Sequence, residues 1–347
     1  MAGQGRRRRL AVLGGGIVFI LSLLAVAGAR SFPVLLAAFT VFFPASGAFV
    51  SLTQAELMDA WPDRQAQVMA RWDLAGSTGA VAGPLLLVAV LAAGGGWRVA
   101  YLVLAALAAV AWLGTCLREP RPARAAGVPG APGAPGAPGA PGVPGALDAG
   151  PGVAWPARVR MVLAALRDWS VVRWALVAVV ADLLVDVLTG FLALYLVDVV
   201  HLAPPVAALA IAIRLGAGLA GDAALVLVLD RVADVTVLRA STVAAALLYP
   251  GFLLAPGPAA KLVILAALSA ATAPWYPLLQ ARLYGSLPGR SPVAVTLSSA
   301  AGLAGGLGPL AVGLAAGAFG LSWALGGLVI VPVAVLAATA GDARAGG

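Results

Sequence analysis

Long apolar stretches recur along this chain and constrain its fold more than any other feature. A helix needs about 20 apolar residues to cross the hydrocarbon core of a bilayer. Ten stretches reach that length, at residues 10–29, 33–58, 70–93, 98–117, 172–199, 204–229, 236–255, 260–284, 293–317 and 321–340. Only 10% of the residues are charged, against about a quarter in soluble domains. We therefore predict an all-α membrane protein with ten transmembrane helices.

The composition excludes several classes of site. The chain has one cysteine, Cys116, and one histidine, His201, so neither an intrachain disulfide nor a histidine metal cluster can form. The sequence contains no nucleophile–base pair and no phosphate-binding loop between a strand and a helix. We therefore expect no enzyme activity, no cofactor and no metal. The net charge of +8 is interpreted as cytoplasmic loop charge and not as a nucleic-acid surface.

The distribution of cations between the loops predicts the orientation. With the amino terminus in the cytoplasm, 18 arginines fall on the cytoplasmic side, and Arg30, Arg98 and Lys261 fall outside. Membrane proteins concentrate Lys and Arg in their cytoplasmic loops. The bias supports an even number of spans, with both termini cytoplasmic in a multi-pass protein of the cell membrane.

A segment rich in proline, glycine and alanine divides the chain at residues 118–170. Glycine occupies every third position from Gly130 to Gly145, but so few triplets without partner strands do not form a collagen helix. We interpret the segment as an extended cytoplasmic linker. The predicted domains are therefore 1–117, with four helices, and 171–347, with six helices, joined by this linker.

An internal repeat relates the two predicted domains. The sequence SLTQAELMDAWPDR (51–64) matches PLLQARLYGSLPGR (277–290) at an offset of 226 residues, which pairs Gln54 with Gln280. Gly83-Pro84 pairs with Gly308-Pro309 at nearly the same offset. Repeated membrane halves are typical of secondary transporters, which bind substrate near the membrane midplane between the halves.

Several motifs, in this order, resemble those of the major facilitator superfamily, whose members have two six-helix halves joined by a long cytoplasmic loop. GQGRRRRL, with Gly5, Arg6 and Arg7, is similar to the end of the family's motif between its second and third helices. GSTGAVAGP (76–84) resembles the glycine-rich motif of the fifth helix, which is common in antiporters. GGGWRVAYLVLA (94–105) resembles the entry to the sixth helix, and DRV (230–232) weakly repeats the first motif.

This resemblance implies that the given sequence begins two helices after the usual start of the family. Arg6 to Arg9 would then lie in the cytoplasmic loop before the family's third helix. The alternative is a signal peptide ending near the sequence AVAGAR. Against it, the apolar stretch of about 20 residues exceeds the usual 7–15, and its removal would leave an odd number of spans.

The ionisable residues within the predicted spans are the candidate site. Asp182 and Asp186 are four residues apart and share a helix face. Arg214, in the next span, is expected at similar depth, because both positions lie about 15 Å into antiparallel neighbouring helices. Charges inside a membrane usually line a cavity or have a partner. The functional hypothesis is a proton-exchanging or cation-binding carboxylate influenced by Arg214, and the alternative is a static ion pair.

Further residues are candidates for gating. At the cytoplasmic ends of spans these are Asp222, Asp230, Arg231, Gln54 and Gln280. For the cluster that contains Gln54, Glu56, Asp59, Arg64, Arg71 and Asp73, a solvated helix end is the alternative interpretation. The glycine motif contributes Gly76, Gly79 and Gly83, spaced for close helix contact, and Pro84, which permits a bend. Simple helix packing without gating is the alternative there.

Together these features predict a monomeric secondary transporter that moves a small organic solute, with proton-coupled efflux as the expected mode. Its expected partners are the solute, protons and the lipid bilayer, and no nucleic acid. Two alternatives remain: a transport-inactive fragment, or a membrane-embedded binding or scaffold protein that never transports. The sequence does not name the solute.

Overall fold

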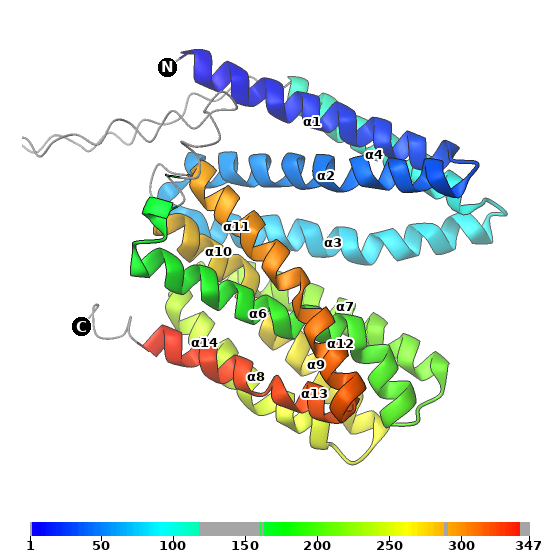
Figure 1. The fold of residues 1–347 in the computed structure, drawn as a ribbon, viewed down its shortest axis with the longest axis vertical. Coiled ribbons are helices and arrows are strands. Elements are labelled where there is room, and N and C mark those ends of the chain that lie inside the picture. The colour runs from blue at the N-terminus through cyan, green and yellow to red at the C-terminus, as the bar shows by residue number, and fades with distance from the viewer. Residues whose placement is uncertain (1, 118–159, 161–162, 288–290, 341–347) are drawn as a thin grey trace, which may run out of the picture. The chain divides into compact units, whose positions relative to one another are not determined.

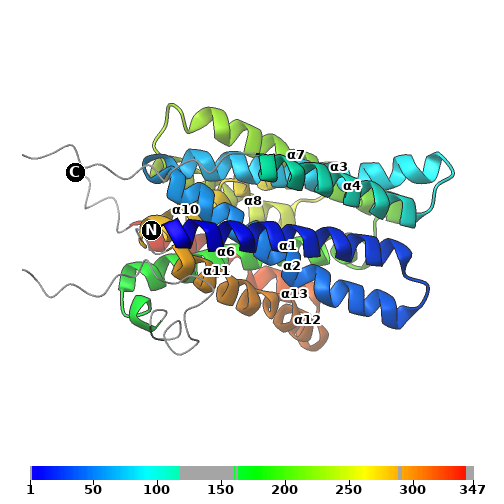
Figure 2. The ribbon, with the colours of Figure 1, turned by 90° about the horizontal axis from the view of Figure 1, so that it is seen from above.

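The computed structural model describes residues 2–117, 160, 163–287 and 291–340, and these contain helices and connecting turns but no strand. The helices are shown in Figures 1 and 2. In chain order they are α1 (Ala2–Gly28), α2 (Phe32–Ala60), η1 (Pro62–Arg64), α3 (Gln65–Ala92), α4 (Trp97–Leu117), α6 (Trp169–Leu194), η3 (Tyr195–Val199), α7 (Pro204–Val228), α8 (Asp234–Leu254), α9 (Pro258–Thr272), α10 (Trp275–Gly285), α11 (Ser291–Gly306), α12 (Gly308–Phe319), α13 (Leu321–Gly327) and α14 (Ile330–Ala340).

Contacts between helices divide the chain into two compact units. The amino-terminal unit comprises Met1–Pro62, Gly83–Met161 and Gly289–Val295. The carboxy-terminal unit comprises Asp63–Ala82, Val162–Pro288 and Thr296–Gly347, so it includes the first part of α3. Most of the predicted linker lies outside the described residues. The predicted domain limits therefore stay a prediction.

Eight of the described helical segments are long and apolar enough to cross a membrane. Val12–Gly28 and Gly308–Phe319 are shorter apolar helices. A multi-pass helical membrane protein is thus observed, while the count of ten spans stays a prediction. The difference arises partly because α9 ends at Thr272 and α10 begins at Trp275, with Pro274 between them. Proline lacks the backbone N–H that an uninterrupted helix needs.

The amino-terminal unit packs α1 against α2 and α4. The indole Nε1 of Trp112 on α4 donates to the Leu13 carbonyl at 2.9 Å. Beside it, Gly16 makes room for the ring, because a Cβ at that position would lie 2.5 Å from Trp112 Cδ1. Arg98 donates to the Ala29 carbonyl at 2.8 Å and so satisfies a free carbonyl just beyond the end of α1.

In the carboxy-terminal unit, α6 is the central helix. It contacts α7, α10, α12 and α14, and Figure 1 shows it alongside α14 and α10. Helices α12 and α13 meet at Gly320, whose φ of 88° is open to glycine but strained for other residues. Figure 2 shows these two helices next to each other.

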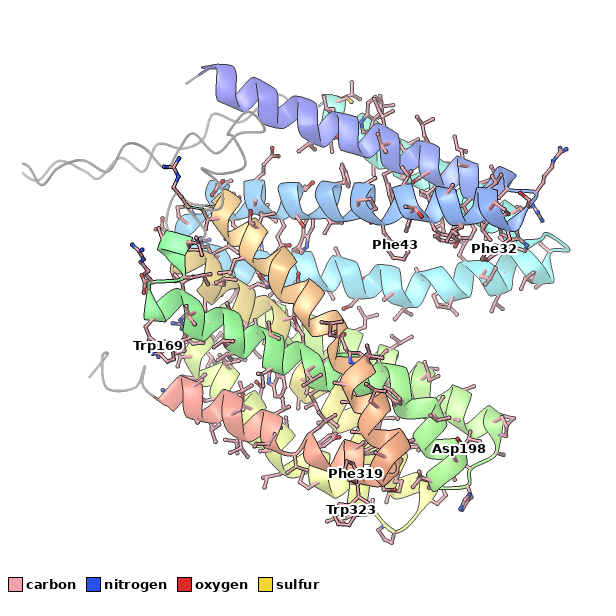
Figure 3. The ribbon with its side chains drawn as sticks, viewed as in Figure 1. Phe32, Phe43, Trp169, Asp198, Phe319 and Trp323 are labelled. Carbon is pink, nitrogen blue, oxygen red and sulfur yellow. The ribbon has the colours of Figure 1, made fainter. Side chains whose placement is uncertain are left out.

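Large aromatic side chains are exposed at both ends of the carboxy-terminal unit. Trp169 is 71% exposed where α6 begins, and Trp323 is 79% exposed on α13. Figure 3 shows Trp169 at one end and Phe319 and Trp323 at the other. Aromatic residues gather at the two membrane–water interfaces. The helices between them therefore present their exposed leucines and valines, such as Leu247 and Val263, to lipid.

Lys261 joins three elements at one end of the carboxy-terminal unit. It was counted among the exterior loop cations, but the structure places it in α9 with only 5% of its surface exposed. Its Nζ donates to the carbonyls of Phe252 at 2.8 Å and Leu253 at 2.9 Å, and to the Tyr195 hydroxyl at 3.2 Å. The two carbonyls belong to the last turn of α8, which has no intrahelical donors for them.

Replacing Lys261 by methionine is expected to destabilise the protein by about 3 kcal/mol, because buried carbonyls lose a charged donor. The measurement is chemical unfolding of the purified protein in detergent micelles. Val263→Met is the control, since residue 263 lies on the same helix and is exposed. Equal stability of the two variants would contradict a capping role for Lys261.

Candidate transport site

Arg214 fastens α7 to α6 beside the predicted aspartates. Its Nη2 donates to the Val185 carbonyl at 2.8 Å and to the Thr189 hydroxyl on the next turn of α6. The structure therefore brings Asp182, Asp186 and Arg214 into the same region, on neighbouring helices of one unit. Among the described residues, Arg214 interacts electrostatically with Asp186 but reaches no ion-pair distance to either aspartate.

The two aspartates of α6 differ in their surroundings. Asp182 is half-buried and interacts with the neighbouring carboxylate of Asp186, whereas Asp186 is exposed and also lies in the field of Arg214. The guanidinium Nε of Arg214 is buried without a hydrogen-bond partner. Asp182 is thus the less compensated of the two carboxylates.

A second group of carboxylates lies between α7 and the first part of α3. Asp222 is 3% exposed, and its Oδ2 accepts a hydrogen bond from Ser77 Oγ at 2.5 Å. Its Oδ1 is buried and has no partner. Asp73, one turn before Ser77, lies within electrostatic range of both Asp222 and Asp182. All four residues belong to the carboxy-terminal unit.

Close packing of α7 against α9 fixes the position of Asp222. At the preceding residue, Gly221, a Cβ would lie 2.7 Å from the Ala270 carbonyl and 2.8 Å from Ala273 Cβ. The helix backbones therefore touch at this point. Because adjacent helical residues point about 100° apart, Asp222 is directed away from α9, toward its partner Ser77 on α3.

The structure separates the residues predicted for gating. Asp230 and Arg231 are exposed in the turn after α7, whereas Asp222 is buried within that helix. Gln54 and Gln280 are both buried, and Gln280 Oε1 accepts a hydrogen bond from Ser298 Oγ at 3.2 Å. The side chains of Gly5, Arg6 and Arg7 in α1 lie outside what the structure describes.

The glycine motif of α3 has open space around it. Added Cβ atoms at Gly76, Gly79 and Gly83 would meet nothing within 4 Å. Pro84 lies inside α3, which continues through it to Ala92. A role in bending therefore stays a prediction.

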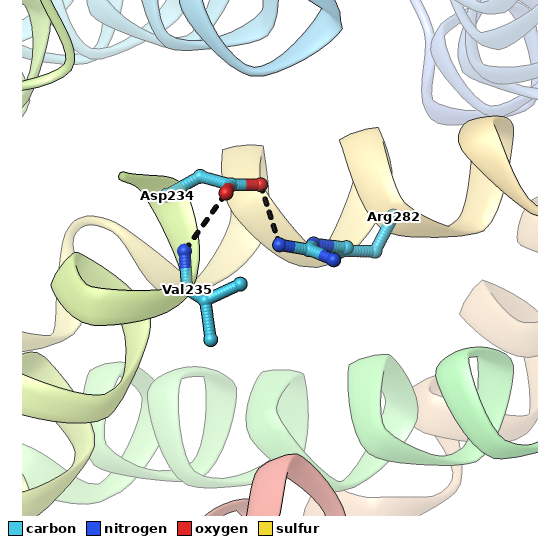
Figure 4. A network of polar contacts seen from close by, with 3 residues as sticks. All are labelled: Asp234, Val235 and Arg282. Carbon is cyan, nitrogen blue, oxygen red and sulfur yellow. Dashed lines mark hydrogen bonds and ion pairs between the residues drawn. The ribbon is translucent and has the colours of Figure 1, made fainter. Parts of the chain in front are cut away.

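Asp234 and Arg282 form an ion pair at the opposite end of α8 from Lys261. Arg282 Nη2 lies 2.8 Å from Asp234 Oδ2, and Asp234 Oδ1 accepts from the Val235 backbone N–H at 2.9 Å (Figure 4). The Arg282 guanidinium also lies 5.8 Å from the ring centroid of Trp174, and Arg173 lies 4.6 Å from the same ring. The cluster ties α8, α10 and α6 together at this end.

Replacing Asp234 by asparagine is expected to cost about 0.5–1 kcal/mol, because both partners of the ion pair are partly exposed. The asparagine retains an oxygen for the Val235 N–H. A double-mutant cycle with Arg282→Met, read by thermal unfolding, measures the coupling. A coupling well above 1 kcal/mol would show that this pair is a principal support of the bundle.

The described residues contain no group of three or more His, Cys, Asp or Glu side chains arranged to hold a metal ion. The chemistry of this region is therefore that of separated carboxylates, a guanidinium and hydroxyl groups. Such groups bind charged solutes and exchange protons, and in a membrane they mark ion and substrate pathways.

A model of the Major Facilitator Superfamily matches residues 4–291 of the sequence. The chain belongs to this superfamily. No curated protein matches the sequence. Among solved structures, it is similar to the E. coli fucose:proton symporter FucP, with a TM-score of 0.73 and 13% identity, over 96% of this chain and 83% of FucP.

A second similar structure is the human organic anion transporter MFSD10. The TM-score is 0.74 at 19% identity, and the match covers 96% of this chain and 77% of MFSD10. At such identities the likeness shows the fold alone. As a member of the Major Facilitator Superfamily, the chain is a multi-pass membrane transporter of small solutes, as the motif order predicted.

Proposed function

We propose that this facilitator is a proton-coupled secondary transporter that exports a small organic solute across the cell membrane. The observation that carries the proposal is the half-buried Asp182 on α6, within a membrane-spanning helix. A charge at the centre of a bilayer costs about 2.5–3.5 kcal/mol on insertion scales. That cost favours a role in moving charge over a purely structural one.

The contacts of Arg214 add to this argument. A static ion pair would direct the guanidinium to a carboxylate, but its hydrogen bonds go to Val185 and Thr189 on α6. Asp182 is consequently left to gain and lose a proton. The fold likeness to a fucose:proton symporter is in keeping with proton coupling. The outward direction rests on the resemblance of residues 76–84 to the glycine motif common in antiporters.

The test is proton flux in liposomes that contain the purified chain and a trapped pH-sensitive dye. Outward-directed gradients of small organic amines, acids and sugars are imposed one at a time. For at least one solute we expect protons to move inward as the solute leaves, because antiport exchanges the two. Outward proton movement would indicate symport. Absence of any solute-dependent flux above that of protein-free liposomes would favour a transport-inactive fragment or a scaffold.

A further inference from the structure

The carboxy-terminal unit carries more negative than positive charge within its spans. Asp73, Asp182, Asp186 and Asp222 lie on α3, α6 and α7, and Arg214 is the cation that interacts with them among the described residues. Arg214 is held at Val185 and Thr189 and interacts with Asp186. Asp73 and Asp222 interact instead with other carboxylates and with Ser77. Their charge therefore lacks compensation within the described residues.

Asp222 has a second deficit, independent of charge. Its Oδ1 is buried and accepts no hydrogen bond, although Oδ2 is bonded to Ser77. A buried acceptor without a partner carries the full cost of its desolvation. A proton bound to this carboxyl would remove the charge, but it would bring no donor to Oδ1. A cation with an N–H group supplies both a donor and a compensating charge.

A metal ion fits this arrangement poorly. Metal ions need several ligands in one tight shell, and the described carboxylates are not grouped closely enough to hold one. They are close enough for mutual electrostatic interaction between Asp73 and Asp222. Carboxylates spaced in this way suit a larger cation whose charge is shared between them.

We infer that Asp222 and Asp73, with the Ser77 hydroxyl holding Asp222 in place, bind the cationic nitrogen of an organic ammonium solute. The inference rests on the proposed transport function, whose substrate class it names. Asp222 Oδ1 accepts an N–H of the ammonium, and Asp73 supplies the second negative charge. Asp182, within electrostatic range of Asp73, makes bound ammonium and bound proton compete, as antiport requires.

The test uses benzylammonium as a probe of the purified full chain in lipid nanodiscs. Benzyltrimethylammonium has the charge without an N–H, and benzyl alcohol is neutral. Binding is measured by calorimetry at constant pH. We expect benzylammonium to bind about tenfold more tightly than benzyltrimethylammonium, because the latter offers Oδ1 no donor. Benzyl alcohol should not bind measurably.

Asp222→Asn should reduce benzylammonium affinity by about tenfold or more, and Asp73→Asn by less. Asp198→Asn is the control, because Asp198 is exposed on η3, at the end of the unit where Trp323 lies (Figure 3). If Asp222→Asn does not fold, Ser77→Ala and Asp73→Asn provide the comparison. Thermal unfolding without probe reports the folding of each variant.

The outcomes separate this inference from the proposed function. Solute-dependent proton flux without amine binding, or amine binding that Asp222→Asn and Asp73→Asn both leave intact, would overturn the ammonium site and leave transport standing. Carboxylate-dependent amine binding without proton flux would support the site and reject proton coupling. Stabilisation by acid alone, lost in Asp222→Asn and unaffected by amines, would identify a proton site and overturn the inference.

Discussion

Replacing Asp182 by asparagine is expected to lower pH-driven transport to the level of protein-free liposomes. Asparagine has nearly the shape of aspartate but cannot take up a proton at physiological pH. The half-buried position of Asp182 and its distance from an ion-pair partner make it the carboxylate that must change its charge during transport. Proton flux under an imposed pH gradient measures the effect.

Asp186→Asn is the matched comparison. Asp186 lies one turn away on the same helix face, but it is exposed and lies in the field of Arg214. We expect this variant to retain most of the flux and both variants to unfold at nearly the wild-type temperature. Normal pH-driven transport by Asp182→Asn would reject Asp182 as the proton carrier. A large fall in its unfolding temperature would indicate a structural role instead.

Replacing Gly221 by leucine is expected to prevent folding of the carboxy-terminal unit. Even a Cβ at this position would lie 2.7 Å from the Ala270 carbonyl oxygen, and that atom belongs to a helix backbone that cannot turn aside. Overpacking a well-filled interface costs about 1–3 kcal/mol, and the whole leucine side chain would force α7 and α9 apart. Yield of monodisperse protein after purification measures the effect.

Gly218→Leu is the control for helix propensity and side-chain size. Gly218 lies one turn earlier on α7, and an added Cβ there would meet nothing within 4 Å. We expect Gly218→Leu to express normally and Gly221→Ala to fall between the two, with a loss of about 1–3 kcal/mol. If Gly221→Leu matched Gly218→Leu, the close approach of α7 and α9 would not be essential for folding.

Much of the helical framework could be predicted from apolar length alone. The predicted spans 98–117 and 204–229 correspond to α4 and α7 within a residue, because each apolar run begins and ends at the helix limits. The interruptions within the last three spans were missed. An average of hydrophobicity does not report backbone hydrogen bonding, so Pro274 was the available signal for the break between α9 and α10.

The site was less predictable. The depth rule placed Arg214 near the aspartates of α6, but it could not tell that Val185 and Thr189 would accept its hydrogen bonds. Asp73 was missed because it follows Arg64 and Arg71 in sequence and was grouped with a solvated helix end. Its eight-residue distance from the start of α3 was a signal that it lies inside the span. Contacts between distant helices, such as that of Ser77 with Asp222, leave no trace in local pattern.

Lys261 has a practical consequence for chemical labelling. It is the single lysine in the sequence, and all three of its N–H groups are engaged in hydrogen bonds at a buried position. Amine-reactive dyes and cross-linkers therefore find no accessible side-chain amine in the native protein. A lysine introduced at an exposed position would become a unique attachment point for a fluorophore, and distance measurements during transport could proceed without removing any native residue.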